Sequence, residues 1–310
     1  MEGGRDVYID GVFSGGGVKG IALVGALQAV EKKGLSFKRT AGTSAGALIA
    51  ALIIAGYKGH ELENILLDTD LTSLLEKNSG FTFPLLRWLM LYWNLGLYSG
   101  KDLELWVGGL LKKKGISTFG DLPEGSLKII VSDITKGRLV VLPDDLAHYG
   151  FVPEQFSVAK AVRMSASLPF FFKPQPLYSI NGKKHYMVDG GILSNFPLWV
   201  FQPPENKKPL RPVLGFQLSA NFNQIPENKI SNAVDMYQAL FETMKRAHDA
   251  RYIEDQKAQN IVFIPINQDI TTAFKLERHG QKKLIMLGKE RTSQFLNTWR
   301  KMPEIQRKDG

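Results

Sequence analysis

Short apolar runs alternate with amphipathic stretches along most of the chain. Runs of about four to eight apolar residues are typical of buried strands, and apolar residues that recur every three to four positions are typical of helices. The pattern predicts strands at 7–13, 37–41, 127–132, 138–142, 185–188, 213–218 and 261–266. It predicts helices at 18–33, 44–55, 101–113, 158–167, 230–256 and 277–300. Strands that alternate with helices indicate a domain of the α/β class.

One segment interrupts this alternation, because it is crowded with leucine, tryptophan and tyrosine. It runs from Phe81 to Tyr98 and reads FTFPLLRWLMLYWNLGLY. The segment is too short for a convincing membrane span and carries Arg87. Two interpretations stay open: a core helix or cap over a site, or an exposed segment that lies in a membrane interface.

The composition indicates one globular domain with a cap or tail. The 310 residues are 44% hydrophobic and 22% charged, which is ordinary for a chain that buries a large core. The chain has no cysteine, so disulfides, thiolate metal sites and cysteine nucleophiles are excluded. Its opening, MEGGRDVYID, lacks a basic start followed by an apolar stretch. We therefore expect no secretory signal and a cytoplasmic protein.

The chain is basic, with a formal net charge of +9. Many of its basic residues follow Lys275, in a stretch that the pattern predicts to be helical. A charge of this size attracts anionic surfaces such as nucleic acid or phospholipid, and it is also typical of a solvated basic helix. The sequence has no zinc-finger spacing, aromatic RNP pattern or basic-region heptads, so we expect no nucleic-acid partner.

A glycine-rich stretch, SGGGVKG, follows the first predicted strand and precedes the first predicted helix. Its spacing from Gly15 to Gly20, GxGxxG, is typical of a dinucleotide-binding turn. Such a site also needs an acidic residue about 20 positions on, where this chain has Lys38 and Arg39. An NADP-binding oxidoreductase that uses these two cations is therefore one alternative. A mononucleotide P-loop is disfavoured, because Ile and Ala follow the last glycine in place of Lys and Ser or Thr.

A second motif, GxSxG, is formed by Gly42, Ser44 and Gly46. It follows a short predicted strand and precedes an alanine-rich predicted helix, which is the context of a nucleophile elbow. Small neighbours let the backbone turn sharply and leave the serine hydroxyl exposed. Ser44 as a plain helix N-cap is the alternative.

Acyl transfer also requires hydrogen-bond donors for the oxyanion. Gly15, Gly16 and Gly17 leave backbone N–H groups unobstructed just before a helix N-terminus, whose dipole favours negative charge. The glycine stretch therefore predicts an oxyanion hole as readily as a cofactor site.

A candidate base for the serine is Asp189, in HYMVDGGILSNFP. It ends a predicted strand, and the two glycines after it permit a tight turn that points the carboxylate into a cleft. An aspartate before two glycines is also an ordinary turn residue. The interpretation as a base depends on the other two motifs.

Together these motifs resemble the patatin-like phospholipase family. The order GGGxKG, GxSxG and DGG is the family's, and the likeness extends to SDITKGRLVVL, to SASLPFFFKP, and to Asn195 and Pro197 after DGG. The resemblance covers about residues 7–220. The resemblance implies a three-layer α/β/α sandwich with a mainly parallel central sheet, and a Ser-Asp dyad without histidine.

The resemblance also implies the role of each site residue. Ser44 is the nucleophile and Asp189 the base, while Gly15, Gly16 and Gly17 form the oxyanion hole. Lys19 takes the family's basic position, where it braces the loop or meets a lipid phosphate. The supporting residues are Lys19, Gly20, Gly42, Gly46, Gly190, Gly191 and Asn195. No cofactor and no metal are implied.

We therefore expect a phospholipase A or lysophospholipase that cleaves carboxyl esters of membrane glycerophospholipids. The alternatives are the NADP-binding oxidoreductase, a lipid-binding protein with a degenerate site, and a Ser-Asp-His triad that uses His248 or His279. The substrate class rests on the resemblance.

The expected organisation is a single domain, 1–310, with its core at about 7–220. An apolar cap is expected at 78–100, with Trp88 or Trp93 reaching lipid, and a basic helical extension from about 275. The expected partner is a phospholipid membrane surface, with which the protein associates peripherally during action. Assembly into a homo-oligomer stays open.

Overall fold

The computed structural model describes most of the chain from Val7 to Trp299. The described residues are 7–70, 73–74, 95–203, 209–218, 230–231, 235–237, 239–244, 247, 260–266 and 277–299.

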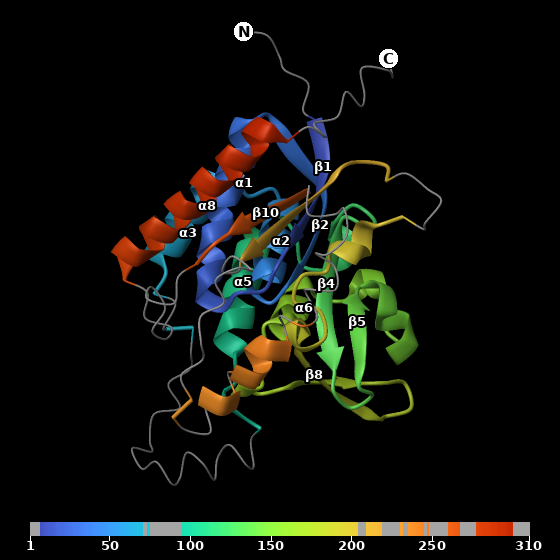
Figure 1. Ribbon diagram of the computed structural model, residues 1–310. Coiled ribbons are helices and arrows are strands. Elements are labelled where there is room, and N and C mark those ends of the chain that lie inside the picture. Colours follow the sequence, from blue (N-terminus) through green and yellow to red (C-terminus); the bar gives the residue numbers. More distant parts are fainter. Residues whose placement is uncertain are drawn as a thin grey trace, which may run out of the picture.

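A mainly parallel sheet forms the centre of the fold (Figure 1). Within the described residues it has eight strands, in the order β10-β9-β1-β2-β4-β8-β7, with β5 also paired to β4. The strands from β10 to β4 are parallel, and β5, β7 and β8 pair antiparallel. Their bounds are Val7–Phe13 (β1), Leu35–Thr43 (β2), Leu127–Asp133 (β4), Arg138–Leu142 (β5), Gln175–Tyr178 (β7), Lys184–Asp189 (β8), Val213–Leu218 (β9) and Ile261–Ile264 (β10).

Helical residues cover both faces of this sheet. Ile9 and Phe13 of β1 pack into the larger core, whereas Val12 points to the other face and packs with Phe196 and Phe201 near short 3-10 helices. The α-helices are Ala22–Lys32 (α1), Ala45–Ile54 (α2), Gly59–Asp68 (α3), Lys101–Lys113 (α5), Val158–Ser165 (α6) and Arg278–Thr298 (α8). The predicted three-layer α/β/α fold is confirmed.

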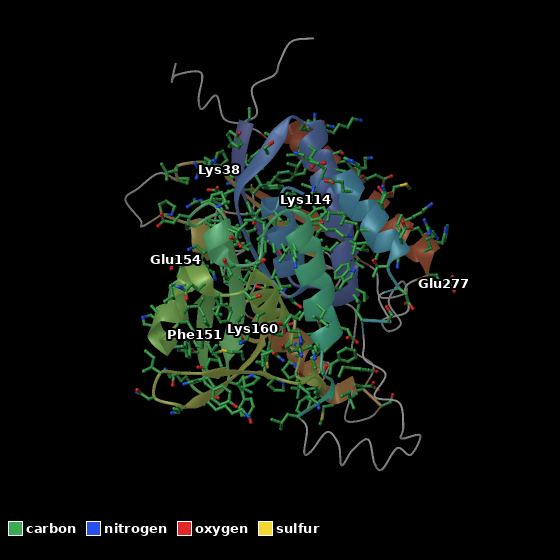
Figure 2. All side chains as sticks on the ribbon, turned by 180° about the vertical axis from the view of Figure 1, so that it is seen from behind. Lys38, Lys114, Phe151, Glu154, Lys160 and Glu277 are labelled. Atoms are coloured by element: carbon green, nitrogen blue, oxygen red, sulfur yellow. The ribbon has the colours of Figure 1, made fainter. Side chains whose placement is uncertain are left out.

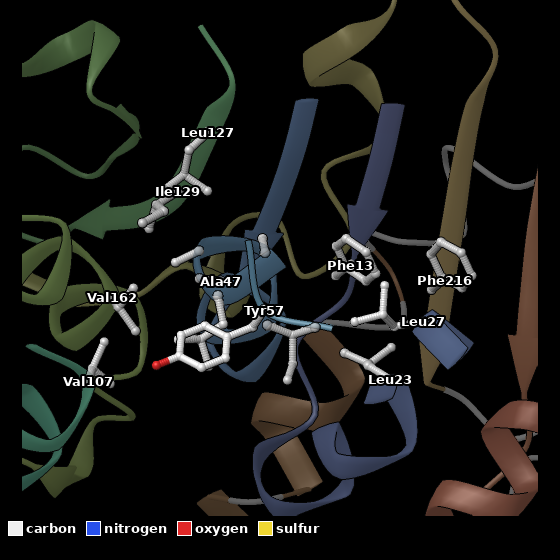
Figure 3. Close-up of a cluster of buried hydrophobic side chains, with 14 of the residues drawn as sticks. Phe13, Leu23, Leu27, Ala47, Tyr57, Val107, Leu127, Ile129, Val162 and Phe216 are labelled. Carbon is white, nitrogen blue, oxygen red and sulfur yellow. The ribbon is translucent and has the colours of Figure 1, made fainter. Parts of the chain in front are cut away.

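The larger core lies between the sheet and the helices (Figure 3). Phe13 and Phe216 stack at 5.1 Å between ring centroids, and Leu23 of α1 packs with them in one cluster. Tyr57, after α2, donates a hydrogen bond from its hydroxyl to the carbonyl of Leu110 at 2.9 Å. Because β1 is covered on both faces beyond Tyr8, Ile9, Val12 and Phe13 are all fully buried.

The outer helices are held by backbone contact and by ion pairs. A Cβ at Gly25 of α1 would overlap the carbonyl of Ile285, and one at Gly288 of α8 would overlap that of Ala22. Lys114, after α5 and labelled in Figure 2, lies 3.0 Å from Glu61 of α3. The helix predicted as a C-terminal extension therefore packs directly on α1 as part of the fold.

Several predicted bounds agree with the structure and others do not. The strands at 7–13, 138–142 and 213–218 and the helix at 101–113 match. The pattern missed α3, β7 and the two-stranded pair of β3 (Gly96–Tyr98) with β6 (Phe170–Phe172). The sheet also extends beyond residue 220, because β10 pairs with β9.

The segment predicted as a cap, 78–100, lies mostly outside the described residues, as do Trp88 and Trp93. Its described end forms β3. Of the helices that the structure describes, none combines the length and the apolar character that crossing a bilayer demands.

Replacing Gly25 with alanine is expected to destabilise the fold by about 1–3 kcal/mol, the usual cost of overpacking. The added methyl group would push α1 away from α8. Gly109→Ala in α5 is the matched control, because its Cβ would meet open space and better helix propensity should stabilise by roughly 0.5–1 kcal/mol. Urea unfolding followed by circular dichroism measures both. Equal stability of the two variants would show that α1 and α8 do not meet through this glycine.

Candidate active site

One edge of β4 brings the predicted serine and aspartate together. The first half of β4 pairs with β2, so that Ile130 lies opposite Thr43. The second half pairs with β8, so that Val131 lies opposite Asp189. Because β5 runs along both halves, it takes the other edge of β4, and β2 and β8 share this one. The ends of β2 and β8 therefore meet on this edge. Ser44, the residue after Thr43, lies at this meeting point, next to the end of β8 at Asp189.

Ser44 occupies a strained turn between a strand and a helix, which is the context of a nucleophile elbow. Its backbone has φ 55° and ψ −122°, a conformation that side chains with a Cβ rarely adopt. It stands at the N-cap of α2, yet its hydroxyl makes no capping hydrogen bond. The plain N-cap interpretation is therefore not supported, because the hydroxyl does not serve the helix.

Ser165, at the end of α6, holds the elbow in place. The Ser44 N–H donates to Ser165 Oγ at 2.8 Å, and Ser165 Oγ donates to the carbonyl of Ile130 at 2.6 Å. The serine thus ties the elbow to β4. Sequence reasoning missed this role, and its one signal was the resemblance of SASLPFFFKP to the family.

The glycines of both motifs allow close backbone approach. A Cβ at Gly42 would overlap the backbone of Gly46, and one at Gly46 would overlap the carbonyl of Phe13. A Cβ at Gly20 would lie 2.5 Å from that of Ala45. These glycines fix the turn of the elbow against β1 and the glycine-rich loop.

The glycine-rich loop lies against the serine. An ideal Cβ at Gly15 would lie 3.3 Å from Ser44 Cβ and 2.6 Å from Asn195 Oδ1. Gly17, with φ +55°, opens the 3-10 helix η1 (Gly17–Ile21), whose first N–H groups have no partner within the helix.

The predicted set of three oxyanion donors needs a correction at Gly15. Its N–H donates to the carbonyl of Asn195 at 3.0 Å and is therefore occupied. Among the described residues, no backbone carbonyl accepts from the N–H of Gly16 or Gly17. These two remain as candidate donors.

Asp189 is almost fully buried, with 4% exposure, and its carboxylate is oriented by the turn that follows. Oδ1 accepts a hydrogen bond from the Gly191 N–H at 2.7 Å, and the Asp189 N–H donates to the carbonyl of Ser167 at 2.9 Å. A Cβ at Gly190 would overlap the carbonyl of Ile130. The two glycines are thus needed to bring the carboxylate against β4.

Asn195 connects the two halves of the site. Its Oδ1, which lies against Gly15, would also lie 3.4 Å from a Cβ at Gly191. The preceding carbonyl, that of Ser194, accepts from the Thr43 hydroxyl at 2.9 Å. Lys19 is half-buried in η1, and its bracing role stays a prediction.

Two aromatic side chains that sequence reasoning did not assign lie near Asp189. Burial raises the pKa of Tyr237, and the nearby charge of Asp189 raises this pKa further. Phe241 Cζ would lie 3.6 Å from a Cβ at Gly191. Both aromatics belong to the predicted helix at 230–256, where such a pattern normally indicates core packing.

The described histidines lie elsewhere. His185 is buried, with Nδ1 3.0 Å from Asp133, and His148 Nδ1 lies 3.2 Å from Asp145. His279 is exposed on α8, two residues after Glu277, which Figure 2 shows at the outer side of the molecule. His60 is exposed on α3, and His248 is outside the described residues.

The two cations that an NADP site would use are engaged elsewhere. Arg39 Nη2 lies 2.5 Å from Asp10 Oδ2, and its guanidinium lies 4.5 Å from the ring centroid of Phe201. Lys38 Nζ lies 5.6 Å from the ring centroid of Tyr8. The NADP interpretation is weakened, because Arg39 already neutralises a buried aspartate.

Several known proteins are similar to this chain in sequence or in fold. "Uncharacterized protein YqhO" of Bacillus subtilis (strain 168) is 50% identical over 294 residues, which are 94% of this chain and 99% of that protein. "Probable lipid hydrolase 463L" of Invertebrate iridescent virus 6 is 28% identical and covers 64% of each chain. The crystal structure of VipD from Legionella pneumophila matches the fold with a TM-score of 0.52 at 19% identity, covering 93% of this chain and 66% of VipD.

The model of the family described as "Patatin-like phospholipase" matches residues 11–201. This range contains the glycine-rich loop, the elbow at Ser44 and the turn after Asp189. The chain therefore belongs to the patatin-like phospholipase family.

Proposed function

We propose that this chain is a serine-dependent acyl hydrolase that cleaves carboxyl esters of glycerophospholipids or lysophospholipids. One observation carries the proposal: Ser44, in a strained elbow, and Asp189 meet along one edge of β4 beside the glycine-rich loop. The family supports lipid esters as the substrate class.

The residues supply each part of a two-step hydrolysis. Ser44 Oγ attacks the acyl carbonyl carbon while its proton passes to Asp189, and the N–H groups of Gly16 and Gly17 stabilise the oxyanion. Collapse of the tetrahedral intermediate breaks the ester bond, and the leaving alkoxide takes the proton from Asp189. Water then attacks the acyl-enzyme, which releases the fatty acid and regenerates Ser44.

An aspartate is a weak base toward serine, since its reference pKa is about 3.9. The glycine-rich loop must therefore contribute much of the acceleration through donors that are preorganised before reaction. The Gly191 hydrogen bond holds the Asp189 carboxylate in one orientation, so that little reorganisation is needed when the proton moves.

Ser44→Ala and Asp189→Asn should each lower ester hydrolysis by orders of magnitude, and the double variant should be little worse, because the two residues act as one unit. Turnover of a soluble short-chain ester and labelling by a fluorophosphonate probe measure this. Ser293→Ala, on α8, is the control that keeps both signals. Additive losses would contradict the dyad, and absence of labelling in the folded protein would favour a degenerate lipid-binding site.

Gly17→Ala should lower turnover about 100- to 1,000-fold, the usual cost of losing one oxyanion donor. The residue needs φ +55°, which a Cβ disfavours. Gly182→Ala is the matched control, since Gly182 has φ +72° and an equally open Cβ position in a loop between β7 and β8. Equal turnover of both variants would exclude the loop from catalysis.

His248→Ala and His279→Ala should leave turnover within about tenfold, whereas loss of a triad base costs far more. A thermal melt must show that each variant is folded. A loss as large as that of Ser44→Ala in either variant would replace the dyad with a triad.

A further inference from the structure

Three apolar side chains of the helical residues 235–237 and 239–244 are exposed. Met236, Leu240 and Met244 are 51%, 57% and 46% exposed, and their spacing of four places them on one stripe. The acidic side chains of this segment, Asp235 and Glu242, are half-buried. An ordinary surface helix has the opposite arrangement, with its charges toward water. Packing among the described residues therefore does not account for the exposed stripe.

Two strained apolar residues extend this surface. Leu95 has φ 59° and Phe170 has φ 65°, and they are 44% and 54% exposed. Among the described residues, the third non-glycine residue with a positive φ is Ser44. Leu95 precedes Gly96, which pairs with Phe170 between β3 and β6, so the two are neighbours. A glycine would fit either backbone without strain, and strain of this kind is concentrated at functional positions.

The surface is continuous with the site. The Phe170 ring packs edge-on against Tyr237 at 4.7 Å between centroids, and Tyr237 stacks with Phe241, which lies over Gly191 beside Asp189. In Figure 1 the helical residues 235–237 and 239–244, in orange, lie below α5 and α6, beyond the ends of the parallel strands. A lipid that reaches Ser44 from this side must cross these apolar side chains.

The chain as a whole is basic, with a formal net charge of +9, which favours an anionic partner. Lys101 is exposed just after β3, and the backbone of Lys173 lies there too, because its N–H donates to the carbonyl of Tyr98 at 2.8 Å. Asp102 and Glu104, in the first turn of α5, are half-buried. Apolar side chains beside cations are typical of surfaces that rest in an anionic lipid interface.

We propose that a docking surface seats this protein on an anionic phospholipid bilayer with the site facing the lipid. The docking surface consists of Leu95, Phe170, Met236, Leu240 and Met244. The inference rests on the proposed function, because a bilayer is the partner that carries the ester to be cleaved. The apolar side chains enter the interface and shorten the path of an acyl chain to Ser44.

The test compares Met236→Glu/Leu240→Glu with Met286→Glu/Leu210→Glu, which adds the same charge at two other exposed apolar positions. Binding is measured by co-flotation with vesicles of phosphatidylcholine and phosphatidylglycerol, with Ser44→Ala present in every protein so that no lipid is consumed. The first pair should weaken binding at least tenfold, and the second should not. Equal binding of the two pairs overturns the proposal.

Leu95→Gly separates docking from folding. It removes an exposed side chain and relieves a positive φ, so the melting temperature should stay or rise while vesicle binding falls. A lower melting temperature with unchanged binding would assign Leu95 to the fold and contradict the proposal. Light scattering in solution tests self-association. If the protein is a dimer and the Met236→Glu/Leu240→Glu variant is a monomer, the surface joins two copies and the docking proposal is contradicted.

Hydrolysis is tested separately with Ser44 intact. The ratio of vesicle hydrolysis to soluble-ester hydrolysis should fall at least tenfold in the first pair and stay unchanged in the second. If wild type hydrolyses neither substrate, the proposed function fails, and the flotation result still decides whether the surface docks to the bilayer.

Discussion

The site depends on one edge of β4, which is shared between a parallel and an antiparallel neighbour. β2 ends opposite Ile130, and β8 ends opposite Val131. Two strands that meet end to end on one edge leave their last residues, Thr43 and Asp189, beside each other. The chain after β2 must then turn out of the sheet at once, and this turn creates the strained backbone of Ser44.

The contacts around the serine over-determine this strained turn. Ser165 accepts from the Ser44 N–H, the Thr43 hydroxyl donates to the carbonyl of Ser194, and the Gly15 N–H donates to that of Asn195. Each bond joins segments far apart in the chain. Together they hold a backbone that would relax if it were isolated, and they leave the Ser44 hydroxyl without a structural task.

The sequence predicted the features that depend on local chemistry. Glycines mark the turns of the elbow and the loop whatever surrounds them, so Gly17 and Ser44 were found from spacing. It did not predict contacts that depend on distant segments: the short strands β3 and β6 exist only as partners of each other, and the N–H of Gly15 is occupied because the Asn195 carbonyl approaches it. It gave no role to Tyr237 and Phe241, because a helical pattern cannot tell a core residue from one beside a site.

The glycine spacing alone cannot tell a phosphate from an oxyanion, because both are anions bound by backbone N–H groups. The distinction comes from what lies next to the loop. Ser44 stands beside Gly15, where a cofactor's pyrophosphate would need room, and Arg39 is committed to Asp10. A charge that develops only while a bond is forming at Ser44 needs donors at that one point and no further ligand. The loop would meet this smaller demand in the proposed reaction, since Gly15 lies beside Ser44 and the next two residues, Gly16 and Gly17, have N–H groups that no described backbone carbonyl accepts.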